Sequence, residues 1–176
     1  MLARRRHMCY IVSLTAHSRS MRFLSETASA ACRQWNRKPL TEDDFYRICR
    51  RLKVSVTEMP LRTNGFYYSV RGSHFIAIDS KLPPVKRLFV MFHELGHFLL
   101  HLPDSGTTAN FHGVGHRDRK EREADIFALC SLIPRSWIAD RSPDELIGDE
   151  GLDPEMVAER DRGLRHRSVR RANGRL

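Results

Sequence analysis

The chain has 176 residues, which is enough for one domain with a substantial hydrophobic core, and its formal net charge at pH 7 is +9. None of the four cysteines belongs to a Cys-x-x-Cys pair, a pattern that favours a reduced, cytoplasmic protein over a secreted one held by disulfides. No stretch is apolar for long enough to span a membrane, so we expect no membrane partner.

The positive charge is concentrated at the two ends of the chain, which carry Arg4, Arg5 and Arg6 and a further seven arginines between Arg160 and Arg175. Basic ends favour acidic partners such as nucleic acid, but solvated ends explain the same pattern equally well. The C-terminal arginines are not interleaved with aromatic side chains that would stack on bases. Direct nucleic-acid binding is therefore left open.

We predict three regions, with boundaries after residues 20 and 140. Residues 1–20 are a basic extension that is either disordered or lies before the true translation start at Met21. Their apolar stretch is too short for a signal peptide, and no A-x-A cleavage site follows it. Residues 21–140 form the main domain, and residues 141–176 form a short, helical, Arg-rich tail.

The spacing of apolar residues, combined with capping and turn signals, predicts an α+β fold. Helices are predicted at six places: about 21–35, 42–52, 84–102 and 118–133, followed by short helices that begin at Pro143 and Pro154. Alternating residues predict three strands, over 54–59, 66–70 and 74–78, the last two joined as a β-hairpin. A polar, Gly-rich loop separates the two long helices.

The most informative stretch is His93-Glu-Leu-Gly-His97, inside the third predicted helix. In a helix His93 and His97 lie one turn apart on the same face, so both imidazoles can reach one metal ion, and Glu94 beside them can act on a water molecule there. The surrounding residues are apolar on every side of the helix, which predicts that these ionisable groups are buried and need partners. Gly96 is unfavourable inside a helix, so we expect another element to pack closely against it.

A catalytic zinc site has three protein ligands, and the best candidate for the third is Glu121 in the next long helix. Glu121, Ala124, Asp125 and Ala128 share one helix face. The alanines allow this face to approach the histidine helix, so Glu121 can reach the metal and Asp125 can accept a hydrogen bond from a ligand histidine. Glu123 points away from this face, which favours Glu121 as the ligand.

Three other histidines are weaker candidates. His101 lies about 12 Å along the helix from the first histidine of the motif, and it is expected to interact with the C-terminal end of that helix. His112 and His116 lie in the Gly-rich loop, where exposed positions are expected. A longer H-E-x-x-H-x-x-G-x-x-H motif is excluded, because Leu100 and Pro103 occupy its Gly and His positions.

Two segments together, His-Glu-Leu-Gly-His-x-x-x-His and Glu-x-Glu-Ala-Asp-x-Phe-Ala-x-x-x-Leu-x-Pro, resemble the ImmA/IrrE family of metallopeptidases. They occupy residues 93–101 and 121–134, and the resemblance extends over about residues 40–134. It implies a small zincin-like domain, mainly helical, with a short antiparallel sheet beside the motif helix. The chain departs from the family at residues 130–134, where Cys-Ser-Leu-Ile-Pro replaces the frequent Leu-Leu-Met-Pro ending; this is a packing change.

The resemblance implies a zinc-dependent endopeptidase that cleaves a helix-turn-helix repressor or antitoxin and so regulates transcription, often in a stress response. We expect His93, His97 and Glu121 to hold the zinc. Glu94 is expected to act as general base, and Asp125 to orient a ligand histidine.

Two questions stay open at this point. The donor that stabilises the oxyanion is left among three side chains of the predicted hairpin, Tyr67, Tyr68 and His74. The edge of that hairpin is also a candidate for pairing with an extended substrate. The alternative function is a non-catalytic, zinc-stabilised binding partner of a transcriptional regulator or antitoxin, although such a partner needs no general base like Glu94.

Overall fold

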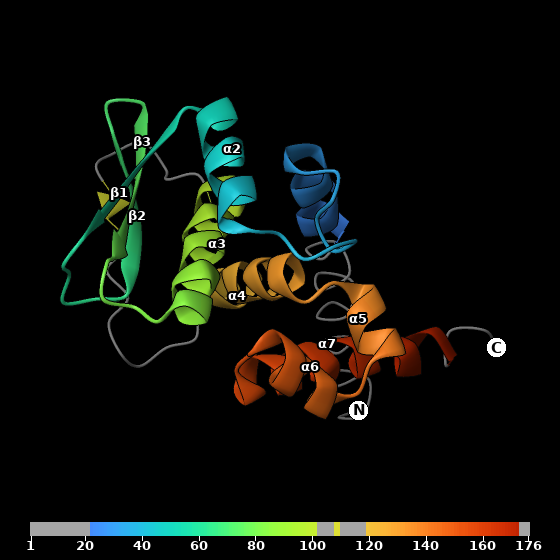
Figure 1. The fold of residues 1–176 in the computed structure, drawn as a ribbon. Coiled ribbons are helices and arrows are strands. Elements are labelled where there is room, and N and C mark those ends of the chain that lie inside the picture. The colour runs from blue at the N-terminus through green and yellow to red at the C-terminus, as the bar shows by residue number, and fades with distance from the viewer. Residues whose placement is uncertain (1–21, 102–107, 110–118, 173–176) are drawn as a thin grey trace, which may run out of the picture.

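The computed structural model describes residues 22–101, 108–109 and 119–172, and for residues 164–172 it describes the helical backbone alone. An unlabelled helix over residues 22–31 comes first. The labelled helices are α2 (Glu42–Leu52), α3 (Pro84–Leu100), α4 (Arg119–Leu132), α5 (Arg135–Asp140), α6 (Pro143–Glu150) and α7 (Pro154–Ala172). Helices α2 and α3 pack beside a small sheet, α4 crosses behind α3, and α6 and α7 pack on each other (Figure 1). The α+β class is confirmed.

The sheet contains β1 (Val54–Met59), β2 (Gly65–Val70), β3 (Ser73–Asp79) and β4 (Thr108–Ala109), in the order β1-β3-β2-β4. As predicted, β2 and β3 form a hairpin, and β2 also runs antiparallel to β4. Strand β1, however, runs parallel to β3. The sheet is therefore mixed, where the sequence predicted an antiparallel one.

The connection between β1 and β2 explains this parallel pairing. It spans residues 60–64, which is long enough to pass the end of β3. Strand β3 therefore lies between β1 and β2 in the sheet and pairs with both. Asp79, the last residue of β3, fixes the crossing, because its N–H donates to the carbonyl of Asn64 and its Oδ1 accepts from the N–H of Leu61. Such long-range pairing leaves no local pattern in the sequence.

All six predicted helices are present among the described residues, and α2 and α6 start at capping signals. Thr41 and Asp44 form a capping box at α2, and Ser142 and Glu145 form one at α6. Helix α5 was not predicted, because its six residues are too few to show a helical period. Helix α7, predicted to be short, has 19 residues.

The hydrophobic core continues past the predicted boundary at residue 140. Leu146, Leu152 and Val157 are buried and belong to the same cluster as the core residues of α2, α3 and α4. Helix α6 and the beginning of α7 therefore pack on the main domain. The division into three regions stays a prediction, and residues 1–20 lie outside the described part of the chain.

Arg160 of α7 differs from the exposed, basic tail residue that its sequence context suggests. It is 6% exposed. Its Nε donates to the carbonyl of Ile133 at 2.8 Å, just past the end of α4, and its Nη2 donates to Oδ1 of Asn36 at 2.6 Å. Arg160 therefore joins three segments that are distant in the sequence, and its guanidinium has a structural role.

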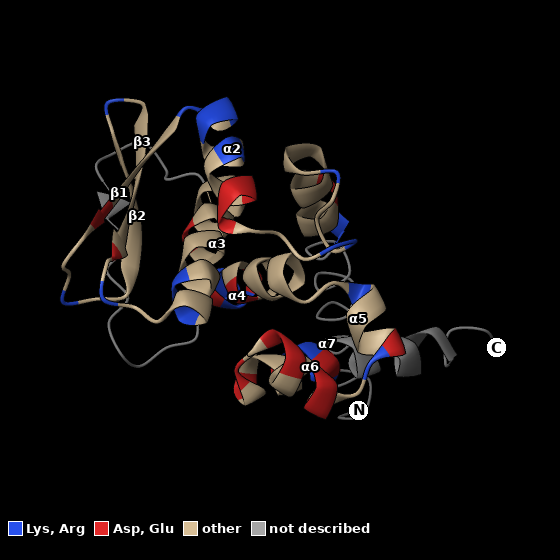
Figure 2. Cartoon of the chain, in the orientation of Figure 1, with Lys and Arg blue, Asp and Glu red and all other residues tan. Residues whose placement is uncertain are grey.

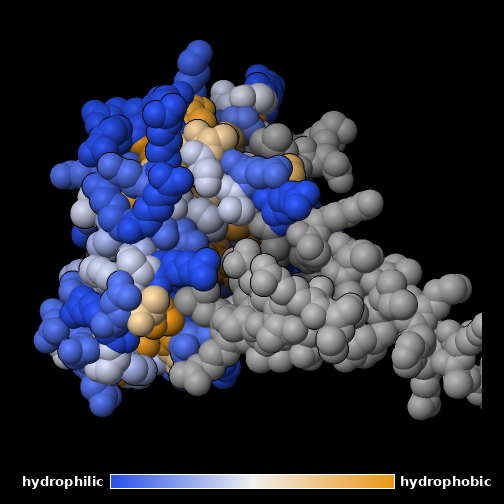
Figure 3. Space-filling view, turned by 90° about the vertical axis from the view of Figure 1, so that its right-hand side faces the viewer, coloured by the Kyte–Doolittle hydropathy of each residue, from blue (hydrophilic) through white to orange (hydrophobic). Residues whose placement is uncertain are grey.

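The described surface carries charges of both signs. Helix α6 holds Asp144, Glu145, Asp149 and Glu150 and no basic residue, so this part of the surface is acidic (Figure 2). The coloured part of the face in Figure 3 is largely hydrophilic, with small apolar areas. Within the described ranges, no helix combines the length and the apolar character needed to cross a bilayer.

Close packing of α3 on α4 sets the geometry of the region around the His-Glu-Leu-Gly-His motif. A Cβ atom added at Gly96 would lie 3.2 Å from the Cα of Ala124 and 3.3 Å from the Cβ of Phe127. The expected close approach at Gly96 is thus confirmed, and it brings the face of α4 that carries Ala124 against the motif.

A Gly96→Ala substitution should destabilise the protein despite the better helix propensity of Ala. Overpacking a tight contact costs about 1–3 kcal/mol, against a propensity gain of about 1 kcal/mol. Thermal unfolding should therefore show a lower Tm. Gly148→Ala in α6 is the matched control, because its Cβ would meet nothing within 4 Å, and it should leave the Tm unchanged or raise it. Equal effects of the two substitutions would contradict the packing argument.

Candidate metal and catalytic site

Helix α3 buries the three polar residues of its motif. His97 is 0% exposed and Glu94 2% exposed, and His93 is largely buried. The helix starts with Pro84 at its first position and contains enough apolar residues to be buried over much of its length. Imidazoles and a carboxylate at such depth require specific partners, because unpaired buried polar groups are costly.

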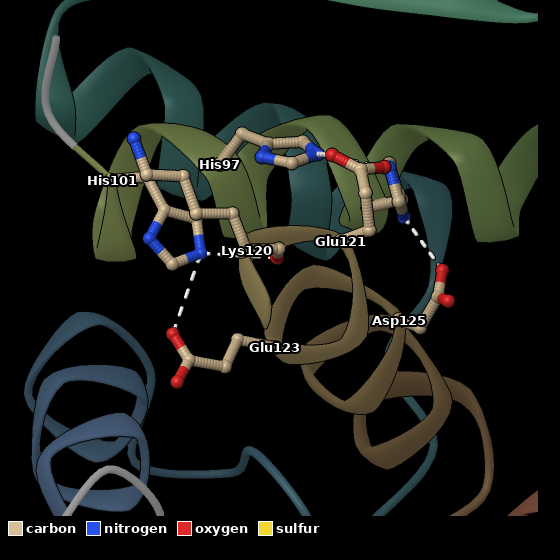
Figure 4. A network of polar contacts seen from close by, with 7 residues as sticks. His97, His101, Lys120, Glu121, Glu123 and Asp125 are labelled. Carbon is tan, nitrogen blue, oxygen red and sulfur yellow. Dashed lines mark hydrogen bonds and ion pairs between the residues drawn. The ribbon is translucent and has the colours of Figure 1, made fainter. Parts of the chain in front are cut away.

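Side chains from two helices converge at this point. The Nε2 atoms of His93 and His97 lie 3.0 Å apart. Glu121 of α4 places Oε1 3.3 Å from His97 Nε2 and Oε2 3.5 Å from His93 Nε2. In Figure 4 the Glu121 side chain lies between His97 and Asp125. Among the described residues, His93, His97 and Glu121 are the group of ligand-type side chains close enough together to hold a metal ion.

These distances fit a zinc site. Tetrahedral zinc with ligand bonds of about 2.0–2.1 Å separates its ligand atoms by about 3.3 Å. The two histidine nitrogens lie 3.0 Å apart, and each lies near a different oxygen of Glu121, at 3.3 Å for His97 and 3.5 Å for His93, so these separations are close to that value. Two imidazole nitrogens and one carboxylate are also a donor set that zinc accepts in hydrolases.

Asp125 fixes the orientation of His93. The Nδ1–H of His93 donates to Oδ1 of Asp125 at 3.0 Å, one helical turn after Glu121 on α4. In the neutral ring, a proton held on Nδ1 leaves the lone pair of Nε2 pointing toward His97 and Glu121. This is the contact that the sequence predicted for Asp125.

Glu94 lies on the sheet side of α3. The backbone N–H of Tyr67 in β2 donates to its carboxylate, while its Oε2 has no hydrogen-bond partner among the described residues. Burial raises the pKa of Glu94 to about 7; the charge of His93 and the Tyr67 hydrogen bond offset part of this rise, and the charge of Glu121 adds to it. A carboxylate with a pKa near neutrality is suited to accept and return a proton.

Comparison with known proteins agrees with this geometry. The family model Peptidase_M78, described as "IrrE N-terminal-like domain", matches residues 49–153, more than half of the chain. The chain belongs to this family. Its resemblance to ImmA/IrrE metallopeptidases, predicted from two segments, is thereby confirmed.

The IrrE-like chain is also similar to "Uncharacterized immunity region protein 2" of Bacillus phage phi105. The two are 35% identical over 74 residues, which is 42% of this chain and 46% of the phage protein. The chain thus spans less than half of that relative, so the similarity concerns a shared segment and does not extend over the two whole proteins.

The other candidate ligands lie apart from the three-residue cluster. Glu123 accepts from Nε of Arg119 at 2.8 Å and lies 3.6 Å from Nε2 of His101. His101 caps the end of α3, as its position predicted, and burial lowers its pKa. His112 and His116 lie outside the described residues.

The three candidate oxyanion donors separate on the two faces of the hairpin. Tyr67 points toward α3, where its ring contacts Phe98, and its hydroxyl is 2.8 Å from Nδ1 of His74. Tyr68 lies on the opposite face, stacked on Phe75, so it is turned away from the motif. Sequence reasoning missed the Tyr67 backbone contact with Glu94, because a backbone donor leaves no residue-type signal.

The pKa of His93 indicates that metal binding must displace a proton from its ring. Burial on its own lowers this pKa, but hydrogen bonds to Asp125 and Glu121, together with the charges of Glu94 and Asp125, raise it to about 10. In the metal-free protein at pH 7 the ring is therefore protonated on both nitrogens. A metal at Nε2 takes the place of one of these protons.

Zinc binding at pH 7 should consequently release a proton, and the affinity should rise with pH below about 10. Calorimetric titration of the metal-free protein with zinc, in two buffers of different ionisation enthalpy, measures the number released. Asp125→Asn removes one of the charges that raise the pKa of His93, so the pH range over which the affinity rises should shift to lower pH. Identical binding heats in both buffers would contradict the protonated state assigned to His93.

Proposed function

We propose that the protein is a zinc-dependent endopeptidase of the cytoplasm that cleaves a helix-turn-helix repressor or antitoxin. The observation that carries the proposal is the convergence of His93, His97 and Glu121 beside a buried Glu94 whose pKa is about 7. The family match supports a metallopeptidase-type hydrolase. The phage relative is named as an immunity region protein, which supports a regulatory substrate in transcription or a stress response.

In the proposed reaction the chain's own residues hold the metal and move the proton. His93, His97 and Glu121 would hold zinc, which supplies polarisation of the scissile carbonyl and acidification of water. With zinc bound, the pKa of Glu94 would fall below its metal-free value of about 7. Glu94 would then be ionised and able to receive the proton of the attacking water. Glu94 then returns a proton to the leaving amine. The Tyr67 N–H orients the carboxylate for both transfers.

The edge of β2 is suited to bind an extended peptide. In the described part of the chain, β4 pairs with β2 at Tyr68 and Ser69. Tyr67, the residue before this pairing, supplies the N–H that contacts Glu94, so a peptide that paired with the hairpin near Tyr67 would pass close to the general base. Backbone pairing accepts many sequences, so substrate choice would depend on side-chain contacts and on the unfolding of a segment of the target.

The purified protein should be incubated with the repressor encoded beside its gene, with zinc or with a chelator, and fragments should be identified by mass spectrometry. We expect cleavage at a defined site that the chelator stops and added zinc restores. Binding of the repressor without any cleavage under all conditions would instead favour the non-catalytic binding partner. A buried carboxylate poised for proton transfer argues against that alternative, because binding alone does not require one.

A further inference from the structure

His101 joins the C-terminal end of α3 to the beginning of α4. It is the C-cap residue of α3, and its backbone N–H donates to the carbonyl of His97. Its side chain is 6% exposed, and Nε2 lies 3.1 Å from the carbonyl oxygen of Lys120. A carbonyl can only accept, so the proton of this hydrogen bond belongs to Nε2 of His101. The neutral ring is sufficient for this bond.

The contact lies next to the proposed metal ligand. Lys120 directly precedes Glu121, and both belong to the first turn of α4, which begins at Arg119. The ends of helices fray more readily than their middles. A ligand in the first turn therefore needs an additional contact to hold its backbone in place.

Contacts between α3 and α4 lie on both sides of Glu121. On one side, His93 donates to Asp125. On the other side, His101 donates to the carbonyl of Lys120 (Figure 4). The His93 contact fixes the direction of a ligand ring. The His101 contact fixes the backbone of the turn that carries the Glu121 carboxylate.

We propose that His101 is a positioning residue, which holds the first turn of α4 so that Glu121 stays within reach of both ligand histidines. The inference rests on the metal-binding role proposed above. His101 acts through the Lys120 carbonyl and is not itself a ligand, since its Nε2 is directed at that oxygen. The ring's second neighbour, Glu123 Oε2 at 3.6 Å, is beyond hydrogen-bond distance.

Two amide substitutions form a matched test. In His101→Gln the side-chain N–H lies the same number of bonds from Cα as Nε2 of histidine, so it can donate to the Lys120 carbonyl. In His101→Asn the amide is one bond shorter and falls short of it. Zinc affinity of the full-length protein, measured by competition with a chromophoric chelator, should stay close to wild type for His101→Gln. It should fall about 10- to 100-fold for His101→Asn, the range seen when partners of metal ligands are lost.

A double substitution separates positioning from a general structural role. In a Glu121→Gln background, His101→Asn should cause little further loss of zinc affinity, because the ligand that it would misplace is already gone. A residue needed only for folding would weaken binding in both backgrounds. Thermal unfolding of the metal-free proteins should show that all variants are folded.

The outcomes distinguish this inference from the proposed function. A wild-type protein that binds no zinc would overturn the proposed function and the inference with it. Wild-type zinc binding with equal affinity in His101→Gln and His101→Asn would overturn the inference alone. Unfolding of His101→Asn would also overturn it, because the assigned role is confined to one turn of α4.

Discussion

A Glu94→Gln protein is expected to retain its zinc and lose its peptidase activity. Glutamine keeps the shape of the side chain and can still accept the N–H of Tyr67, so the fold should be preserved. It cannot take up a proton from water, and loss of a general base typically lowers the rate about 10²- to 10⁴-fold. None of the three proposed ligands is altered, so metal content should match that of the wild type.

Zinc content and repressor cleavage should be measured on the same preparation, so that the two effects are separated. A His93→Ala/His97→Ala double variant provides the opposite control, since it should lose both zinc and activity. Cleavage by Glu94→Gln at the wild-type rate would show that another group accepts the proton. Loss of zinc from Glu94→Gln would show that Glu94 contributes to holding the metal.

Glu121→Gln and Glu123→Gln should differ sharply in zinc affinity, although the same chemical change is made two residues apart on one helix. Glu121 is the carboxylate that lies 3.3 Å and 3.5 Å from the histidine nitrogens. Its loss removes a charged ligand and should weaken binding by more than about 100-fold, the upper end for residues that only support ligands. Glu123 contacts Arg119 and His101 instead, so its amide should bind zinc nearly as tightly as the wild type.

The comparison requires the same competition assay for both variants and thermal unfolding of their metal-free forms. Glu123→Gln reports any general effect of removing a negative charge from the start of α4. If Glu123→Gln were the variant that lost zinc, the helix would present a different face to the histidines in solution.

Features that follow from local spacing could be predicted from the sequence. His93, Glu94 and His97 lie on one helix, so the helical period alone determines their relative positions. Glu121 and Asp125 required a second step, the inference that small residues on α4 face Gly96, and the structure places both beside the histidines. Their chemical roles stay predictions until metal and activity are measured.

Features that depend on backbone groups or on distant segments could not be predicted in the same way. The N–H of Tyr67 and the carbonyl of Lys120 exist in every residue, so no residue type marks them as partners of Glu94 and His101. The parallel pairing of β1 depends on a crossing connection, which residue patterns do not encode. Arg160 lies in a basic segment that resembles a solvated tail, yet its partners are 27 and 124 residues away.

The buried Arg160 also limits where the chain can be joined to another domain. The family match ends at residue 153, but the donor for the carbonyl of Ile133 comes from Arg160, which is encoded later. During synthesis the C-terminal end of α4 acquires this donor only after most of the chain has been made. A domain joined in place of the residues after 153 would deprive the matched region of that donor, so viable fusions, natural or engineered, should join the chain beyond Arg160.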